Sequence, residues 1–129
     1  MLWHEEDAIL SKDYPFLLNR DGTPYDFTND VGEGWESLCI RTFEKIFEAY
    51  ARHADDSSRF ALVQIKEKFG GLRIYLGGME TGLFEDVNDI VENAESESFT
   101  ICEKCGKPGK PREGGWIKTL CDDCATERT

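Results

Sequence analysis

The four C-terminal cysteines constrain this chain more than any other feature of its sequence. They form two Cys-X-X-Cys pairs, Cys102 with Cys105 and Cys121 with Cys124, separated by fifteen residues. Each pair lets two thiolates from one tight turn reach the same ion, and two such turns complete a tetrahedron of soft ligands that suits Zn²⁺. Gly106 follows the first pair, where the chain needs room to reverse. The sequence therefore predicts a four-cysteine zinc site.

Two alternatives fit the cysteine pattern less well. Disulfides suit a secreted chain, but no apolar signal segment starts this one. A redox pair is expected once, beside a βαβ unit, rather than as a spaced duplicate. Because protein fills all four ligand positions, the predicted zinc is structural. We expect it to order residues 99–129 as a zinc ribbon, which is disordered without the metal.

Charge is distributed unevenly along the chain. Residues 1–98 contain 21 Asp and Glu against 9 Lys and Arg, residues 99–129 contain 5 against 6, and the net charge is −11. An acidic body repels phosphate backbones, which disfavours non-specific binding of nucleic acid by the whole chain. The acidity serves either solubility or an acidic binding face. No apolar run is long enough to span a membrane, and reduced thiols indicate a cytoplasmic location.

Apolar periodicity predicts two amphipathic helices. One runs from Trp35 to Tyr50 and the other from about Gly82 to Ser98, with apolar residues at intervals of three and four positions. The predicted buried faces comprise Leu38, Cys39, Phe43, Ile46, Phe47 and Tyr50 in the first helix, and Leu83, Val87, Ile90, Val91 and Ala94 in the second. Cys39 is interpreted as a small core residue rather than a nucleophile. Residues 1–31 are expected to form a short helix and an irregular loop.

A β-hairpin is predicted between the two helices. Residues 60–66 are rich in β-branched and apolar side chains, residues 72–76 alternate, and Phe69-Gly70-Gly71 lies between them. The alternation directs Leu72, Ile74 and Leu76 toward the helices. The predicted fold class is therefore α+β. It consists of an acidic body, residues 1–98, with two amphipathic helices packed on a small antiparallel hairpin sheet, followed by the four-cysteine zinc ribbon, residues 99–129.

Basic residues near the hairpin turn and in the ribbon loop are candidates for binding. The hairpin set either holds an anion or a partner's carboxylates, or protects an edge strand from aggregation. The ribbon set either docks nucleic acid by phosphate contacts and one stacking ring, or its tryptophan covers the zinc turns or packs the ribbon onto the body. The hairpin set is Lys66, Lys68 and Arg73, and the ribbon set is Lys107, Lys110, Arg112 and Trp116.

No catalytic motif is recognisable in the sequence. His4 and His53 are the only histidines, and neither lies near a cysteine or serine constellation. The patterns of a nucleophile elbow, a phosphate-binding glycine loop and a helical zinc-protease motif do not occur. His53 follows the end of the first helix, where it is expected to be an ordinary exposed residue. We therefore expect a protein without enzymatic activity.

Three segments together resemble a known family. They are Gly32-Glu33-Gly34-Trp35, the KEKFGGLRIY run that ends at Tyr75, and the ribbon segments CGKPGK and GGWIKTLCDDC. The chain resembles a family of small zinc-ribbon proteins found in tailed phages, prophages and bacteria, over most of residues 14–124. Members often carry histidine as the fourth ligand, so the resemblance places Cys124 at the last ligand position in a different chemical form. It implies a phage or prophage context.

These features predict a binding function. The leading hypothesis is a non-enzymatic zinc-binding protein of phage or prophage type that binds a host or defence protein as an inhibitor or adaptor. A basic nucleic-acid enzyme is the expected class of partner, because opposite charge raises encounter rates. The alternative is a nucleic-acid-binding protein that uses the ribbon loop and the lysine-rich hairpin, with strongly salt-dependent affinity.

Overall fold

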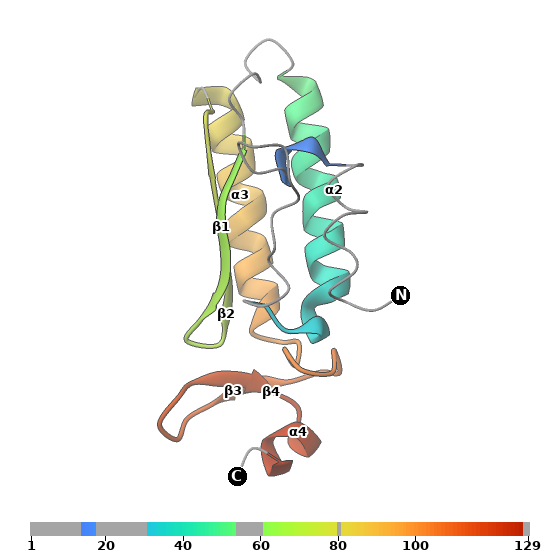
Figure 1. Ribbon diagram of the computed structural model, residues 1–129, viewed down its shortest axis with the longest axis vertical. Coiled ribbons are helices and arrows are strands. Elements are labelled where there is room, and N and C mark those ends of the chain that lie inside the picture. Colours follow the sequence, from blue (N-terminus) through green and yellow to red (C-terminus); the bar gives the residue numbers. More distant parts are fainter. Residues whose placement is uncertain (1–13, 18–30, 54–60, 80, 128–129) are drawn as a thin grey trace.

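Two helices and one hairpin make up the larger part of the structure (Figure 1). The computed structural model describes residues 14–17, 31–53, 61–79 and 81–127. Helix α2 spans Glu36–Arg52 and helix α3 spans Thr81–Ser98. The helices lie side by side and run in opposite directions, and strands β1 (Ala61–Lys68) and β2 (Gly71–Gly77) form an antiparallel pair that packs along α3.

A small ribbon lies across the end of this body at which the hairpin turns (Figure 1). Its strands β3 (Lys110–Arg112) and β4 (Lys118–Leu120) are antiparallel, and the short helix α4 (Asp122–Glu127) follows. An isolated bridge joins Ile101 to Pro108. The described elements thus confirm the predicted α+β fold, with a C-terminal segment that is compatible with a ribbon.

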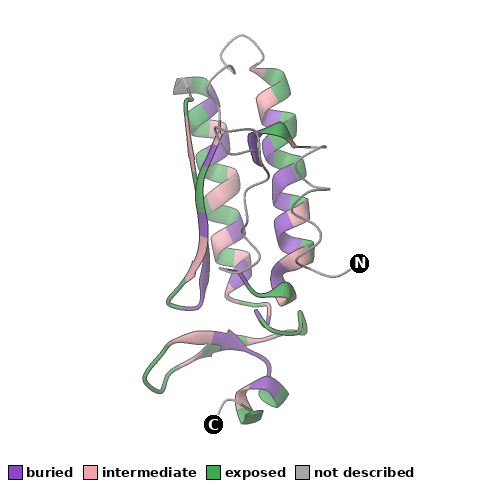
Figure 2. Ribbon diagram, viewed as in Figure 1, coloured by how far each residue is buried: buried purple, intermediate pink, exposed green. Residues whose placement is uncertain are grey.

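The core lies between the two helices and the inner face of the hairpin (Figure 2). Apolar side chains at helical spacing on α2 and α3 meet Leu62, Ile65, Leu72 and Ile74 of the strands. The largest fully buried side chains include Trp35, Phe43, Ile46, Leu72 and Leu83. Cys39 is also fully buried, as its position on the apolar face of α2 predicts. Burial of such side chains is the main stabilising contribution available to this part of the chain.

Several local predictions need correction. The sequence pattern places Phe47 on the buried face of α2, but this residue is 38% exposed and packs its ring against Tyr14 and Tyr50 at the surface. Helix α2 begins one residue later than predicted, after a 3-10 turn at Glu33–Trp35 (η3). The prediction that His53 is an ordinary exposed residue is wrong, because it is half-buried with Nε2 2.9 Å from Asp86 Oδ2.

The predicted N-terminal helix and loop lie mostly outside the described residues. Within residues 1–31, the described part shows a 3-10 turn at Pro15–Leu17 (η2), in which Phe16 and Leu17 are buried. This turn contacts strand β1. His4 also lies outside the described residues.

The hairpin is longer than the sequence pattern predicts, and its turn is tighter. Lys68 pairs with Gly71, so only Phe69 and Gly70 form the turn. Because side chains alternate between the faces of a strand, the pairs Gln64–Tyr75 and Lys66–Arg73 lie on the outer face, opposite the buried core residues. A register shift between Leu62 and Gln64 adds Val63 to the exposed residues of β1.

Candidate metal centre and its junction with the body

The four predicted ligands meet at one point of the ribbon. The Sγ atoms of Cys102, Cys105, Cys121 and Cys124 all lie within 4.8 Å of one another, and Cys105 Sγ is 3.5 Å from Cys121 Sγ. Tetrahedral sulfur ligands around a zinc ion stand about 3.8 Å apart, given Zn–S bonds of about 2.3 Å. All four cysteines are free of disulfides, and all but Cys105 are buried. The arrangement can hold one metal ion with a complete set of protein ligands.

Local backbone structure fixes both cysteine pairs. In the first pair, the Gly106 amide donates to Cys102 O over 2.9 Å, and Gly106 adopts a φ of +83° that favours glycine. In the second pair, the first turn of α4 brings the Cys124 amide within 3.4 Å of Cys121 Sγ. Amides directed at sulfur stabilise thiolates and orient them toward a metal.

The thiols of the cluster differ in how readily they ionise. Burial opposes ionisation of Cys102, but backbone hydrogen bonds from Cys121, Cys105 and Lys104 outweigh it and lower the pKa of this thiol to about 6. The hydrogen bond with Cys121, together with burial, raises the pKa of Cys124 to about 12. Four thiolates therefore do not coexist here without a cation to offset their mutual repulsion. A soft divalent metal ion bound by the four sulfur atoms would supply that charge.

The segment of residues 32–35 forms a seat for the first cysteine turn. The Gly34 amide donates to Glu103 O over 3.0 Å, and Trp35 Nε1 donates to Ile101 O over 2.9 Å. A Cβ atom on Gly34 would lie 2.1 Å from Cys102 O, and one on Gly32 would lie 2.2 Å from Glu103 O. Only glycine allows such close backbone contact. These two glycines therefore place the metal centre directly against the start of α2.

The hairpin turn makes the second contact with the ribbon. Thr119 Oγ1 donates to Gly70 O over 2.6 Å, and Lys118 Nζ lies 3.3 Å from Glu67 Oε1 and 3.0 Å from Glu103 Oε1. Burial lowers the pKa of Lys118, but its bonds with Glu103 and Glu67 outweigh this effect and raise the pKa. The side chains of Glu67 and Glu103 are only 13% and 10% exposed, so Lys118 neutralises charge that is largely shielded from water.

Strand β2 extends this junction to the end of α3. The Leu72 amide donates to Ser98 Oγ over 2.9 Å, and a Cβ atom on Gly71 would lie 2.6 Å from the ring of Phe99. The KEKFGGLR run is therefore largely a packing device that joins hairpin, helix and ribbon. Its exposed members are Lys68 and Phe69, and Lys66 is half-buried on the outer face.

Three of the six predicted binding cations are paired with carboxylates. Arg73 Nε lies 2.9 Å from Glu95 Oε1, Arg112 donates to Asp122 over 2.7 Å, and Lys107 lies 3.9 Å from Asp123. The hydrogen bond from Arg112 also lowers the pKa of Asp122. Lys110 is exposed on β3, and its charge acts on Asp122 as well. The cations of the ribbon are thus mostly directed at α4.

Lys66, Lys68 and Trp116 have different surroundings. Lys66 Nζ lies over the Tyr75 ring at 5.9 Å from its centroid, and Lys68 Nζ lies over the Phe69 ring at 5.7 Å. Trp116 is 71% exposed, so the interpretation that it packs the ribbon onto the body is wrong. The structure brings Lys66, Lys68 and Arg73 together on the outer face of the hairpin, but not Lys107 and Arg112.

Sequence reasoning missed the exposed apolar residues of the hairpin side. Val63, Phe69, Tyr75 and Phe84 are all exposed, and Tyr75 and Phe84 line one open depression. Two signals pointed to them. The adjacent Leu62 and Val63 break the alternation of β1, and Phe69 stands where a tight turn favours asparagine or glycine.

Comparison with known proteins identifies no relative: no protein-family model, no curated protein and no solved structure matches the chain. Among the described residues, no helix is both long and apolar enough to cross a membrane.

Proposed function

We propose that the protein is a non-enzymatic adaptor or inhibitor, built around a structural zinc ion, that binds another protein through the outer face of its hairpin. We define this hairpin face as Val63, Lys66, Lys68, Phe69 and Tyr75. The zinc ion holds the ribbon in place, and the ribbon in turn supports the hairpin turn.

Zinc is proposed because of the chemistry of its ligands. Four thiolates with two Cys-X-X-Cys spacings form a ligand set that is typical of structural zinc sites and leaves no open position for a substrate. A closed site supports folding rather than catalysis. This is the basis for proposing a protein without enzymatic activity.

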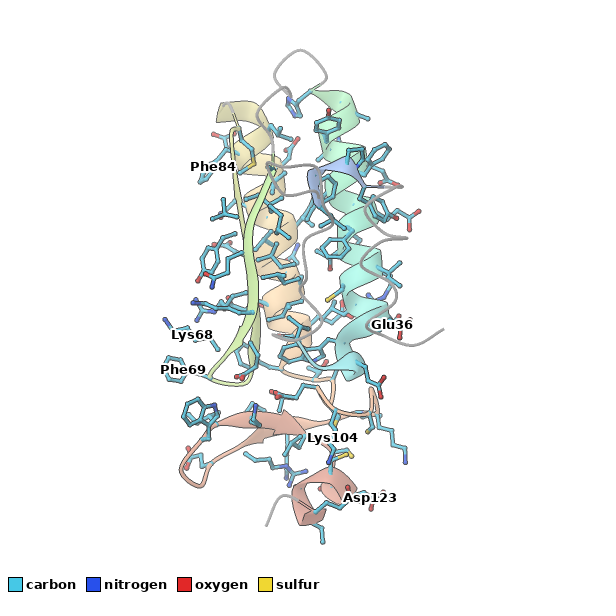
Figure 3. The ribbon with its side chains drawn as sticks, viewed as in Figure 1. Glu36, Lys68, Phe69, Phe84, Lys104 and Asp123 are labelled. Carbon is cyan, nitrogen blue, oxygen red and sulfur yellow. The ribbon has the colours of Figure 1, made fainter. Side chains whose placement is uncertain are left out.

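Exposure of apolar side chains on the hairpin face carries the proposal of protein binding. Val63 is 64% exposed, Phe69 63% and Tyr75 41%. Lys68, Phe69 and Phe84 project from the hairpin side of the molecule, away from α2 (Figure 3). Exposed aromatic side chains on one side of a protein are typical of interfaces, whose most important contacts are often made by aromatic and arginine residues.

Nucleic-acid binding is the weaker candidate on charge grounds. The exposure of Trp116 favours a stacking role, but Lys107 and Arg112 are paired with acidic residues of α4. A phosphate backbone would have to displace Asp123 and Asp122 from them. The whole chain also carries a net charge of −11. Both effects oppose binding of a polyanion.

The resemblance to phage, prophage and bacterial proteins motivates a host or defence protein as the partner. Overall acidity speeds encounter with a basic protein such as a nucleic-acid enzyme. The acidic side of α3, with Glu85, Asp89 and Glu92 exposed, is the part of the described surface that would supply this attraction. Close contact is proposed at the hairpin face.

The proposal is tested by affinity capture from bacterial lysate with the zinc-loaded protein. Capture is performed with and without nuclease, and Tyr75→Glu serves as the matched variant because it places a charge on the exposed hairpin face without altering the core. The proposal predicts a stoichiometric protein that survives nuclease and is lost with Tyr75→Glu. Recovery of nucleic acid alone, or equal capture by both forms, would contradict it.

A further inference from the structure

The hairpin turn contains an aromatic residue in a backbone conformation that disfavours it. Phe69 has a φ of +54° and is followed by Gly70 at +83°. Phe69 is the single non-glycine residue with positive φ in the described part of the chain. Positive φ at both central positions is the pattern of type I′ turns, which favour Asn-Gly. Reversing the chain here does not require phenylalanine, and a bulky residue at positive φ is a genuine outlier.

Contacts around the turn hold this conformation in place. The Gly70 amide donates to Glu67 Oε2 over 2.7 Å, and Gly70 O accepts from Thr119 Oγ1 of the ribbon. Glu67 is itself fixed by Lys118, which also binds Glu103 beside the metal ligand Cys102. The ring of Phe69 receives no such cover, since 63% of the residue is exposed. Figure 3 shows it projecting outward from the tip of the hairpin.

A second exposed aromatic residue belongs to the same junction. Trp116 precedes Lys118 and Thr119 by two and three residues, and these two residues make the bonds to Glu67 and Gly70. The bonds of Lys118 and Thr119 to Glu67 and Gly70 therefore hold the end of the ribbon loop beside the hairpin turn. Each presents one large exposed ring, with Lys68 over the ring of Phe69.

We propose that Phe69, Trp116 and Lys68 form the anchor site for an acidic segment of the partner that carries a large apolar side chain. This inference rests on the proposed protein-binding function and names the chemistry of the partner. Residues in unfavourable backbone conformations that are held by their surroundings cluster at functional sites. The exposed ring of Phe69 is therefore interpreted as a contact for a partner. The apolar side chain contacts the two rings, while its acidic neighbours pair with Lys68.

The charges at the anchor site favour an acidic peptide segment over a second copy of this chain or a nucleic acid. No carboxylate among the described residues pairs with Lys66 or Lys68, whereas Arg73, Lys107, Arg112 and Lys118 all have one. A second copy docked symmetrically on the same face would bring like lysines together. Nucleic acid would meet the carboxylates that surround the ribbon cations. An acidic peptide segment neutralises the two lysines without either penalty.

The test is selection of binders from a random peptide library displayed on a carrier, with the full-length, zinc-loaded protein as bait. Selected peptides are then synthesised, and their affinities are measured by fluorescence anisotropy against the unmodified protein and its variants. Phe69→Asn is the central variant, because asparagine suits the turn but removes the ring. Trp116→Ala removes the second ring. Phe47→Leu is the matched control, an exposed aromatic on α2 outside the site.

The inference predicts peptides enriched in Asp or Glu next to Trp, Phe or Leu. Phe69→Asn and Trp116→Ala should each weaken their binding about tenfold or more, while Phe47→Leu leaves it unchanged. Phe69→Asn should also raise the melting temperature, which separates loss of recognition from loss of folding. Peptides without acidic bias, or binding that is indifferent to both ring variants, would overturn the anchor site while leaving protein binding intact. Failure to select any peptide would also overturn the anchor site, whereas the proposed function itself is contradicted only by the capture experiment described above.

Discussion

The body and the ribbon of this protein are held together by different means. Among the described residues of the body, sixteen buried hydrophobic residues form one cluster between two helices and a hairpin. In the ribbon, the buried cluster consists of Leu120 and the metal ligands Cys102, Cys121 and Cys124. Apolar burial therefore stabilises the body, whereas we expect the ribbon to depend on a metal ion, because its described residues have almost no other core.

This difference explains why the two parts meet largely through glycines and hydrogen bonds, while Ile101 is the ribbon residue that packs against the core of the body. Gly34 and Gly70 bring backbone against backbone, and Lys118 bridges Glu67 and Glu103. Such contacts demand accurate geometry but bury little apolar surface. We therefore propose that the ribbon takes its place against the body only after a metal ion has fixed its cysteine turns.

Loss of a metal ligand should have the largest effect. Cys102→Ser removes one of four thiolates, so zinc affinity measured by competition with a chromophoric chelator should fall by several orders of magnitude, given that structural zinc contributes about 10–16 kcal/mol to small domains. Cys39→Ala is the control, because this fully buried cysteine belongs to the body. Its zinc affinity should equal that of the unmodified protein. Equal losses in both variants would refute the separation of the two parts.

Truncation of a core side chain of the body should lower the stability of the body and leave zinc affinity unchanged. Ile46 is fully buried, and Ile46→Ala should lower the free energy of unfolding of the body by about 2–5 kcal/mol in a urea titration followed by circular dichroism. Glu48→Ala, exposed on the same helix, should change it little. Zinc affinity under native conditions should be unaffected by either substitution. A strong coupling of Ile46→Ala to zinc affinity would show that the parts share one core.

A substitution in the segment of residues 32–35 should affect the contact between the body and the ribbon. Gly34→Ala would place Cβ 2.1 Å from Cys102 O, where backbone rather than a flexible side chain must move. We expect a loss of about 1–3 kcal/mol, seen as weaker zinc binding and altered Trp35 fluorescence. Ser37→Ala, three residues away and exposed, is the matched control. If Gly34→Ala behaves like Ser37→Ala, the ribbon is not seated as described.

The smallest effect is expected at an exposed ion pair of the body. Arg41 Nη2 lies 2.5 Å from Glu97 Oε2, with the side chains 46% and 40% exposed. The hydrogen bond from Arg41 lowers the pKa of Glu97, so its contribution is present above the unfolded pKa of Glu97 and is lost as the pH falls through the folded value. Arg41→Gln should cost no more than about 0.5 kcal/mol at neutral pH in thermal unfolding, and less in acid. A difference that grows in acid would contradict this assignment.

The periodic parts of the fold were predictable from the sequence, while the junction was not. Intervals of three and four residues identified α2 and α3, and the spacing of the cysteines identified the four side chains that meet in the ribbon, because each pattern reflects a local constraint. The roles of Gly34, Glu67 and Lys118 depend on segments distant in sequence. For the same reason, no local pattern separates Arg112, which is paired with Asp122, from Lys68, which lies over the Phe69 ring.

The most direct test of this account is an NMR comparison of the ¹⁵N-labelled protein with zinc and after chelation, together with the zinc content per chain. We expect one zinc ion per chain. On its removal, the amide resonances of residues 102–127 should lose their dispersion, while those of α2 and α3 persist and the body changes mainly near Gly34, Gly70 and Leu72. A ribbon that keeps its dispersion without metal, or helices that unfold together with it, would contradict the account.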